Sequence, residues 1–145
     1  DFFRENKTSW EQIINKVAEK IKYWNAITQV EKNSIGSVVY EQLRTLCGNN
    51  LILGFNTTQQ SKQDIIEDLK LSFAKHTINI PTKTLNPQMH IELASFGYKL
   101  LPSGKISYQG ASGMPDDIVM ALAIANNTFV TKKSKGTYAV YSGMR

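Results

Sequence analysis

Two adjacent carboxylates, Asp116 and Asp117, open a stretch of the chain that is otherwise apolar. Pro115 suits the first position of a helix, because its missing N–H is not needed there and its backbone angle φ is already helical. The acidic pair then falls in the first turn, where free N–H groups and the positive end of the helix dipole stabilise anions. Residues 118–125 carry no charge, which predicts a helix packed on more than one face. An acidic pair here is also an ordinary helix cap, so a chemical role requires a further carboxylate nearby.

Glu31 is the candidate for that further carboxylate. It ends the β-branched segment 26–31, which predicts a strand that stops where residues 32–36 break the pattern. A side chain at the carboxyl end of a central strand emerges at the edge where open α/β sheets place their ligands. On spacing alone, the favoured interpretation of Glu31 is a solvated strand end or a helix-cap partner. If the helix of Asp117 packs beside this strand, the two carboxylates could share Mg²⁺, which accepts one or two carboxylates together with waters and substrate phosphates.

Other catalytic chemistries find no support in the sequence. The single cysteine, Cys47, ends an apolar helical face and is interpreted as a small buried hydrophobic residue. His76 and His90 are isolated and belong to no metal-binding pair. Gly104 and Lys105 resemble the end of a phosphate-binding loop, but Lys99 stands where that loop needs its first glycine.

The composition favours one globular domain. The chain has 145 residues, of which 41% are hydrophobic and 10% aromatic, enough for a sizeable core. No apolar run approaches the roughly 20 residues that cross a bilayer, and the N-terminus does not read as a signal peptide. One cysteine excludes an internal disulfide and indicates a reducing, cytosolic-type environment. Seventeen basic and twelve acidic residues give a net charge of +5, which is compatible with a polyanionic partner.

The elements that would position the acids follow from apolar spacing and turn residues. The first half predicts a helix over roughly residues 9–24 opened by a Thr8–Glu11 capping box, a strand at 26–31, a helix from Gly36 to Gly48, and a strand at 51–55. Strand, helix and strand in succession imply a parallel crossover. The second half predicts a helix capped by Ser61, a short strand at 77–80, a helix at 85–96, a β-hairpin at about 98–108, the acidic helix, and a late strand or ordered tail at 138–141.

Two segments carry a resemblance to a known family. Residues 27–36, Ile-Thr-Gln-Val-Glu-Lys-Asn-Ser-Ile-Gly, resemble the strand–Glu–x–Asn–small–x–Gly segment of viral terminase large-subunit nuclease domains. Residues 113–122, Gly-Met-Pro-Asp-Asp-Ile-Val-Met-Ala-Leu, are similar to their closing Gly-x-His-Asp-Asp-Leu-Val-Met-x-Leu helix. The resemblance implies an α/β, RNase H-like fold with a mixed sheet flanked by helices. The hairpin at 98–108 is similar to the family's hairpin near its DNA-binding face.

The resemblance also implies a metal site. In that family three acidic residues hold two Mg²⁺ or Mn²⁺ ions that cut packaged DNA. By this match Glu31 is the second acid and Asp117 the third, and Asp116 is an auxiliary ligand or a cap. The metals would activate water and stabilise the leaving oxygen in an in-line attack.

The sequence departs from the family pattern at two places. Pro115 replaces a frequent histidine before the acidic pair. The first acid of the family lies in an apolar Asp-x-x-x-Gly strand, and nothing before Glu31 has that form; Asp1 and Glu5 stand in a polar segment and are poor substitutes. The resemblance therefore implies that residues 1–145 form a single, partial nuclease domain that lacks the opening strands and the upstream packaging ATPase.

The leading hypothesis is a metal-dependent endonuclease domain that cuts concatemeric DNA during packaging, and that is weakly active or inactive as this fragment. Its implied partners are double-stranded DNA, the portal protein, the small terminase subunit and the upstream ATPase, at the procapsid portal in the host cytoplasm. We expect phosphate contacts from Lys62, Lys99, Lys105, Lys132 and Lys133, although dispersed lysines are also ordinary solvated surface. The alternatives are another RNase H-like nuclease, such as a resolvase or transposase core, and a non-catalytic DNA-binding or motor-docking module.

Overall fold

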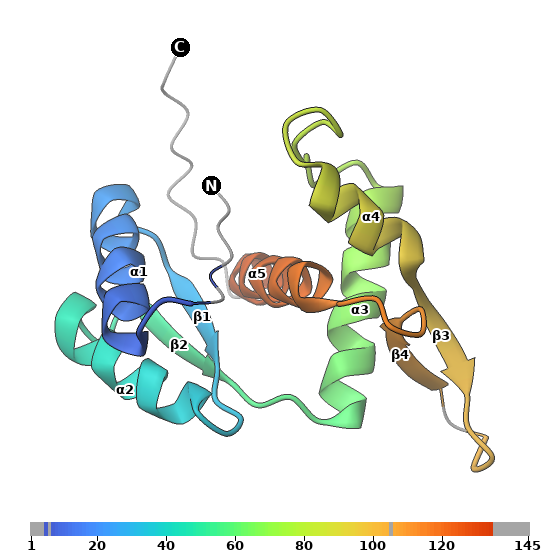
Figure 1. Cartoon of the computed structure of the whole chain (residues 1–145), viewed down its shortest axis with the longest axis horizontal. Helices are drawn as coiled ribbons and strands as arrows, with labels where there is room; N and C mark the ends of the chain where they lie inside the picture. Colours follow the sequence, from blue (N-terminus) through green and yellow to red (C-terminus); the bar gives the residue numbers. More distant parts are fainter. Residues whose placement is uncertain (1–4, 6, 105, 135–145) are drawn as a thin grey trace. The chain divides into compact units, whose positions relative to one another are not determined.

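The computed structural model describes residues 5, 7–104 and 106–134, with side chains described as far as residue 130. The chain divides into two compact units, one up to Thr57 and one from Thr58 onward (Figure 1). Each unit is considered by itself below. The expected strand or tail at 138–141 lies outside the described residues.

The first unit is a strand–helix–strand crossover covered by one further helix. It contains α1 (Trp10–Trp24), β1 (Thr28–Glu31), α2 (Gly36–Cys47) and β2 (Ile52–Phe55). The two strands pair in parallel, as predicted, with Glu31 opposite Phe55 at the end of the register. Helix α2 makes the connection because parallel strands cannot be joined by a tight turn.

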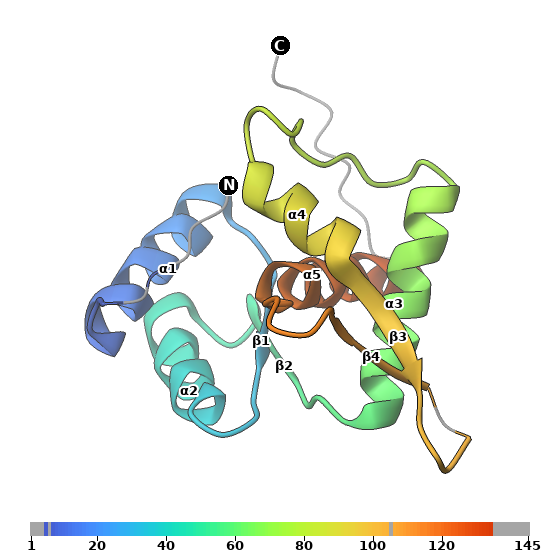
Figure 2. The ribbon, with the colours of Figure 1, turned by 45° about the vertical axis from the view of Figure 1, so that its right-hand side comes forward.

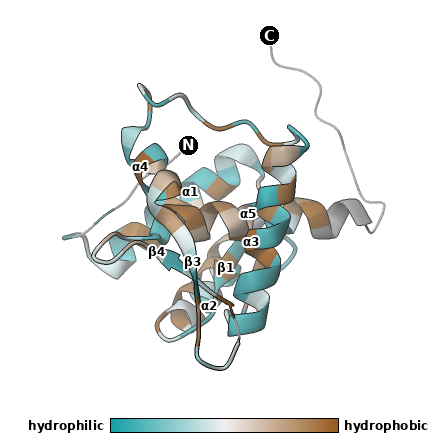
Figure 3. Ribbon diagram, turned by 90° about the vertical axis from the view of Figure 1, so that its right-hand side faces the viewer, coloured by the Kyte–Doolittle hydropathy of each residue, from teal (hydrophilic) through white to brown (hydrophobic). Residues whose placement is uncertain are grey.

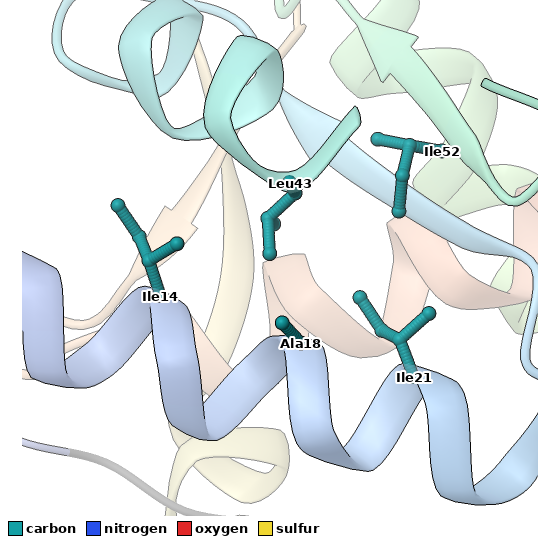
Figure 4. Packing of buried hydrophobic residues seen from close by; sticks show 5 residues of the cluster. All are labelled: Ile14, Ala18, Ile21, Leu43 and Ile52. Carbon is teal, nitrogen blue, oxygen red and sulfur yellow. The ribbon is translucent and has the colours of Figure 1, made fainter. Parts of the chain in front are cut away.

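The core of the first unit forms where the apolar stripe of α1 meets α2 and β2. It consists of Ile14, Ala18, Ile21, Leu43 and Ile52, all of them buried (Figure 4). The residues from α1 recur three or four positions apart, so they lie on one face of the helix. Val30 of β1, the neighbour of Glu31, is partly buried and packs against this core.

The second unit consists of a hairpin and three helices, and two of these helices pack against the third, which is apolar. It contains α3 (Gln59–Ala74), α4 (Pro87–Ser95), β3 (Phe96–Leu100), β4 (Ile106–Gly110) and α5 (Asp117–Ser134). Helix α5 contacts both α3 and α4, and it is hydrophobic along much of its length (Figures 2 and 3). Ile118, Val119, Ala123 and Ile124 are buried on it, which agrees with a helix packed on more than one face.

Two predicted helix caps are wrong by a few residues. In α1 the cap is Ser9, whose hydroxyl accepts from the N–H of Gln12 at 3.3 Å, whereas Thr8 donates to Glu5 instead. In α3 the cap is Thr58 rather than Ser61. These two residues form a reciprocal capping box, since each side chain accepts from the other's backbone N–H. A capping pair of Thr and Ser differs from the usual Ser/Thr–Glu pattern, which explains the error.

Two further boundaries differ from prediction. Residues 77–80 do not form a strand, because the N–H of Thr77 turns back onto the carbonyl of Ser72 at the end of α3. Helix α5 begins at Asp117 and not at Pro115. The carbonyl oxygens of Met114 and Pro115 lie against Gly110, so this segment is part of the turn that leaves β4.

The α/β fold class and the hairpin are confirmed. The hairpin is antiparallel, with Tyr98 opposite Tyr108, and it starts two residues earlier and ends two residues later than predicted. The described residues form two sheets of two strands each, one parallel and one antiparallel. In the described part of the chain, no helix has both the length and the apolar character that a bilayer crossing requires.

Candidate functional site

Glu31 is the last residue of β1, at the carboxyl end of the parallel pair. The ladder continues one step beyond it, because the N–H of Lys32 donates to the carbonyl of Phe55 at 2.7 Å. The Glu31 side chain is exposed. The backbone at Glu31 is therefore held against β2, while the side chain is exposed to solvent.

The loop that follows Glu31 is fastened by Asn33. Its side-chain amide donates to the carbonyl of Thr57 at 2.8 Å, and its side-chain oxygen accepts from the N–H of the same residue at 3.1 Å. This pair of bonds ties the loop after β1 to the chain that follows β2. The asparagine two residues after Glu31 therefore has a structural role, which is to hold this loop in place.

Gly36, the first residue of α2, is the last residue of the Glu–x–Asn–x–x–Gly motif. A Cβ atom at this position would lie 2.0 Å from the carbonyl oxygen of Glu31, a distance that no real Cβ contact shows. Only glycine lets the start of α2 approach β1 this closely. The Glu–x–Asn–x–x–Gly spacing therefore describes a tight turn that places the backbone of Glu31.

Asp116 and Asp117 occupy different positions at the start of α5. The carbonyl of Asp116 accepts from the N–H of Met120 at 2.9 Å, so Asp116 is the capping residue that precedes the helix. Asp117 is the first helical residue and is exposed. The interpretation of Asp116 as a cap agrees with this geometry.

Asp116 is paired with Lys62 of α3. The ammonium of Lys62 lies 3.1 Å from the Asp116 carboxylate, and the two side chains are 25% and 30% exposed, respectively. Lys62 was expected to contact DNA phosphates, and in the structure its charge is directed to an acid of the candidate site. Half-buried pairs of this kind are screened less than pairs on the open surface.

A third carboxylate at this end of α5 was missed by sequence reasoning. Glu92 of α4 has an exposed fraction of 0%, and its Oε2 accepts from the N–H of Ile118 at 2.8 Å. Gln88, one turn earlier, donates to its Oε1 at 3.4 Å. The available signal was the position of Glu92 three residues after buried Met89, on the inward face of α4.

The remaining predicted residues are placed only in part. Lys99 lies exposed on β3. Lys105 lies outside the described residues, as do the side chains of Lys132 and Lys133. Glu5 forms an ion pair with Lys16 and accepts a hydrogen bond from the Thr8 hydroxyl, so its carboxylate has partners within the first unit. Asp1 lies outside the described residues.

The donor chemistry fits a hard divalent cation, since exposed carboxylate oxygens are the ligands that Mg²⁺ prefers. Glu31 belongs to the first unit, and Asp116 and Asp117 belong to the second. Within the described residues, no three His, Cys, Asp or Glu side chains gather into a group that could hold a metal ion. These residues therefore carry oxygen atoms of the right chemistry, but the described residues do not form a metal site.

Comparison with known proteins defines the class of fold. The chain has the fold of the nuclease domain of a viral large terminase, and the RNase H-like expectation is confirmed at the level of fold. No protein-family model matches the sequence, and no curated protein matches it.

Two crystal structures of the large terminase nuclease from thermophilic phage G20c match the fold of this chain. The first is 24% identical in sequence, with a TM-score of 0.68, and the match covers 86% of this chain and 64% of that one. The second, with bound magnesium, is 21% identical, with a TM-score of 0.70, and the match covers 84% of this chain and 63% of that one. The match thus spans less than two thirds of the length of these nuclease structures.

Proposed function

We propose that this chain is part of a metal-dependent DNA endonuclease domain of the large-terminase type. The observation that carries the proposal is the agreement of fold with a terminase nuclease over 86% of the chain. The exposed carboxylates at the end of β1 and the start of α5 support it. We further propose that residues 1–145 form one partial nuclease domain.

The proposed metal ligands are Glu31 and Asp117, with Asp116 as an auxiliary ligand. One of the matching nucleases has bound magnesium, which supports Mg²⁺, or Mn²⁺ in its place. When bound, such ions supply a nucleophilic water and charge stabilisation for phosphodiester hydrolysis, in a two-metal site of the intact domain. The chain's own part is positional, because Asn33 and Gly36 hold the backbone of Glu31.

Duplex DNA is the proposed substrate. The net charge of +5 supports a polyanionic partner, and Lys99, Lys105, Lys132 and Lys133 are proposed phosphate contacts. Lys62 would have to exchange its carboxylate partner Asp116 for a phosphate, so we assign it first to the acidic pair. In the intact parent we propose cutting of concatemeric DNA at the procapsid portal in the host cytoplasm, with the portal protein, the small subunit and the ATPase domain as partners.

The test is nicking of supercoiled plasmid by the chain in Mn²⁺, an assay in which one cut per molecule is visible. We expect weak nicking that needs the metal and is lost in Asp117→Ala and in Glu31→Ala. Glu67→Ala and Glu19→Ala, which remove exposed acids from α3 and α1, serve as matched controls and should retain it. Nicking that survives Asp117→Ala would contradict the assignment of the ligands.

DNA binding separates the proposal from a non-catalytic module. For a nuclease site, we expect Mg²⁺ to change the affinity of the chain for duplex DNA, and Glu31→Ala to abolish that change. A module that only binds DNA would lose affinity steeply with salt, since Lys–phosphate contacts release counterions. Its affinity for DNA would not change with Mg²⁺ or in Glu31→Ala. Salt-dependent binding of the second kind, together with an absence of nicking, would overturn the proposed function.

A further inference from the structure

Glu92 is a fully buried acid that the proposed chemistry does not use. Glutamate is almost never completely buried unless its carboxylate is paired, because removing it from water is costly. Here Oε2 accepts from the N–H of Ile118 at 2.8 Å and Oε1 accepts from Gln88 at 3.4 Å. A buried carboxylate aimed at the first turn of α5 therefore calls for an explanation beyond packing.

The acceptor that Glu92 offers is the one that a helix cap usually provides. The first N–H groups of a helix have no partner within it, and the side chain of the capping residue normally accepts from the second or third of them. The capping residue of α5 is Asp116, and its Oδ2 lies 3.1 Å from the ammonium of Lys62. The N–H of Ile118, the second helical residue, bonds to Glu92 instead.

Two acids therefore have separate roles at the start of α5. Glu92 reaches across from α4 to hold the backbone, and Asp116 keeps its carboxylate at a half-exposed position beside exposed Asp117. An acid that accepted from the backbone N–H would have fewer lone pairs left for a cation, so the two roles would compete. A buried surrogate acceptor removes that conflict.

We infer that Glu92 is a positioning residue for the acidic pair: it fixes the first turn of α5, and with it the direction of the Asp117 carboxylate. The metal-binding consequence rests on the proposed function, whereas the positioning of the turn does not. Partners that orient metal ligands typically change metal affinity by about 10–100-fold when they are removed. A purely structural Glu92 would instead stabilise the second unit as a whole.

Three variants separate these roles. Glu92→Met keeps about the same length and volume and removes the acceptor. Glu92→Gln keeps one oxygen that can face the N–H of Ile118, and its amide can face Gln88 if that side chain turns over. Ile65→Val removes one buried methylene from α3 in the same unit and serves as the matched control for general loss of stability.

The first measurement is amide hydrogen exchange of the whole chain, which needs neither metal nor DNA. In Glu92→Met we expect exchange at Ile118 to rise at least about tenfold more than at Ala123, which is buried farther along α5. Glu92→Gln should restore most of the protection, and Ile65→Val should change the two sites alike. Equal changes at Ile118 and Ala123 in Glu92→Met would overturn the inference.

The second measurement is Mn²⁺ affinity by titration calorimetry. We expect Glu92→Met to weaken binding about tenfold or more, with Glu92→Gln and Ile65→Val within about threefold of the unaltered chain. Unchanged affinity in Glu92→Met would overturn the link to the metal. If the unaltered chain binds no Mn²⁺, the proposed function fails, and the exchange pattern alone decides whether Glu92 positions the turn.

Discussion

Gly36 approaches the backbone of Glu31 so closely that a Cβ atom would lie 2.0 Å from the Glu31 carbonyl oxygen. The contact is backbone to backbone, so no side chain can move aside to relieve it. The start of α2 can therefore lie this close to the end of β1 only because residue 36 has no side-chain methyl group.

Gly36→Ala should displace Glu31 and abolish metal-dependent nicking. The displacement should also cost about 1–3 kcal/mol of unfolding free energy, as overpacking generally does. Urea unfolding and the plasmid assay check the two effects. Gly97→Ala is the matched control, because a Cβ atom there meets nothing within 4 Å. Nicking by Gly36→Ala at the level of the control would contradict the role given to this contact.

Asn33→Ala should loosen the loop after Glu31. It removes two hydrogen bonds to the backbone of Thr57, each with a net value of about 0.5–1.5 kcal/mol, and both are exposed to competing water. We expect a loss of about 1–2 kcal/mol in the free energy of unfolding. Asn15→Ala, at an exposed position of α1, provides the baseline. A loss no larger than that of Asn15→Ala would show that the amide bonds contribute nothing.

Lys62→Met should strengthen Mn²⁺ binding several-fold and weaken DNA binding. Removal of the ammonium leaves the Asp116 carboxylate without its cationic partner. A metal ion then no longer has to compete with the lysine for this carboxylate. The stability of the fold should fall by less than about 1 kcal/mol, as for other partly exposed pairs. Calorimetry with Mn²⁺ measures the first effect, and Lys70→Met, an exposed lysine of the same helix, is the control. Weaker Mn²⁺ binding in Lys62→Met would show that Lys62 supports the metal site.

Glu5 should titrate below the usual range of a glutamate. The hydrogen bond from Lys16 lowers the pKa of Glu5, with smaller contributions from Thr8 and from the charge of Lys16. A lowered folded pKa means that the pair contributes stability above the unfolded pKa, and that this contribution is lost as the pH falls through the folded pKa. Carboxyl NMR titration of Lys16→Met should return the Glu5 pKa toward its ordinary value. Lys22→Met should leave it unchanged, and a shift in both variants would point to general charge effects.

The elements around Glu31 could be predicted because their signals are local. Alternating β-branched residues predicted β1, and Gly36 and Gly48 marked the limits of α2. A helix between two successive strands indicated that the strands pair in parallel. The boundaries that failed depend on tertiary contacts. The start of α5, for example, is displaced by the turn that packs against Gly110.

Glu92 shows what local patterns cannot supply. Within α4, its spacing from Met89 places it on the inward face, but nothing nearby in the sequence indicates which group its carboxylate binds. Its burial depends on Ile118, 26 residues later, whose N–H needs an acceptor only after α5 has formed. The pairing of Lys62 with Asp116 across two helices is hidden from the sequence for the same reason.

The parallel register that sets Glu31 opposite Phe55 leads us to expect a particular order of folding. The β3–β4 hairpin closes across a short turn, and hairpins form in about 1–10 μs. The β1–β2 pair must first close a loop that contains the whole of α2, and this entropic cost is met before any ladder bond is gained. We therefore expect the strand end that carries Glu31 to assemble late, and a pulse-labelling experiment during refolding should find β1 protected after the hairpin.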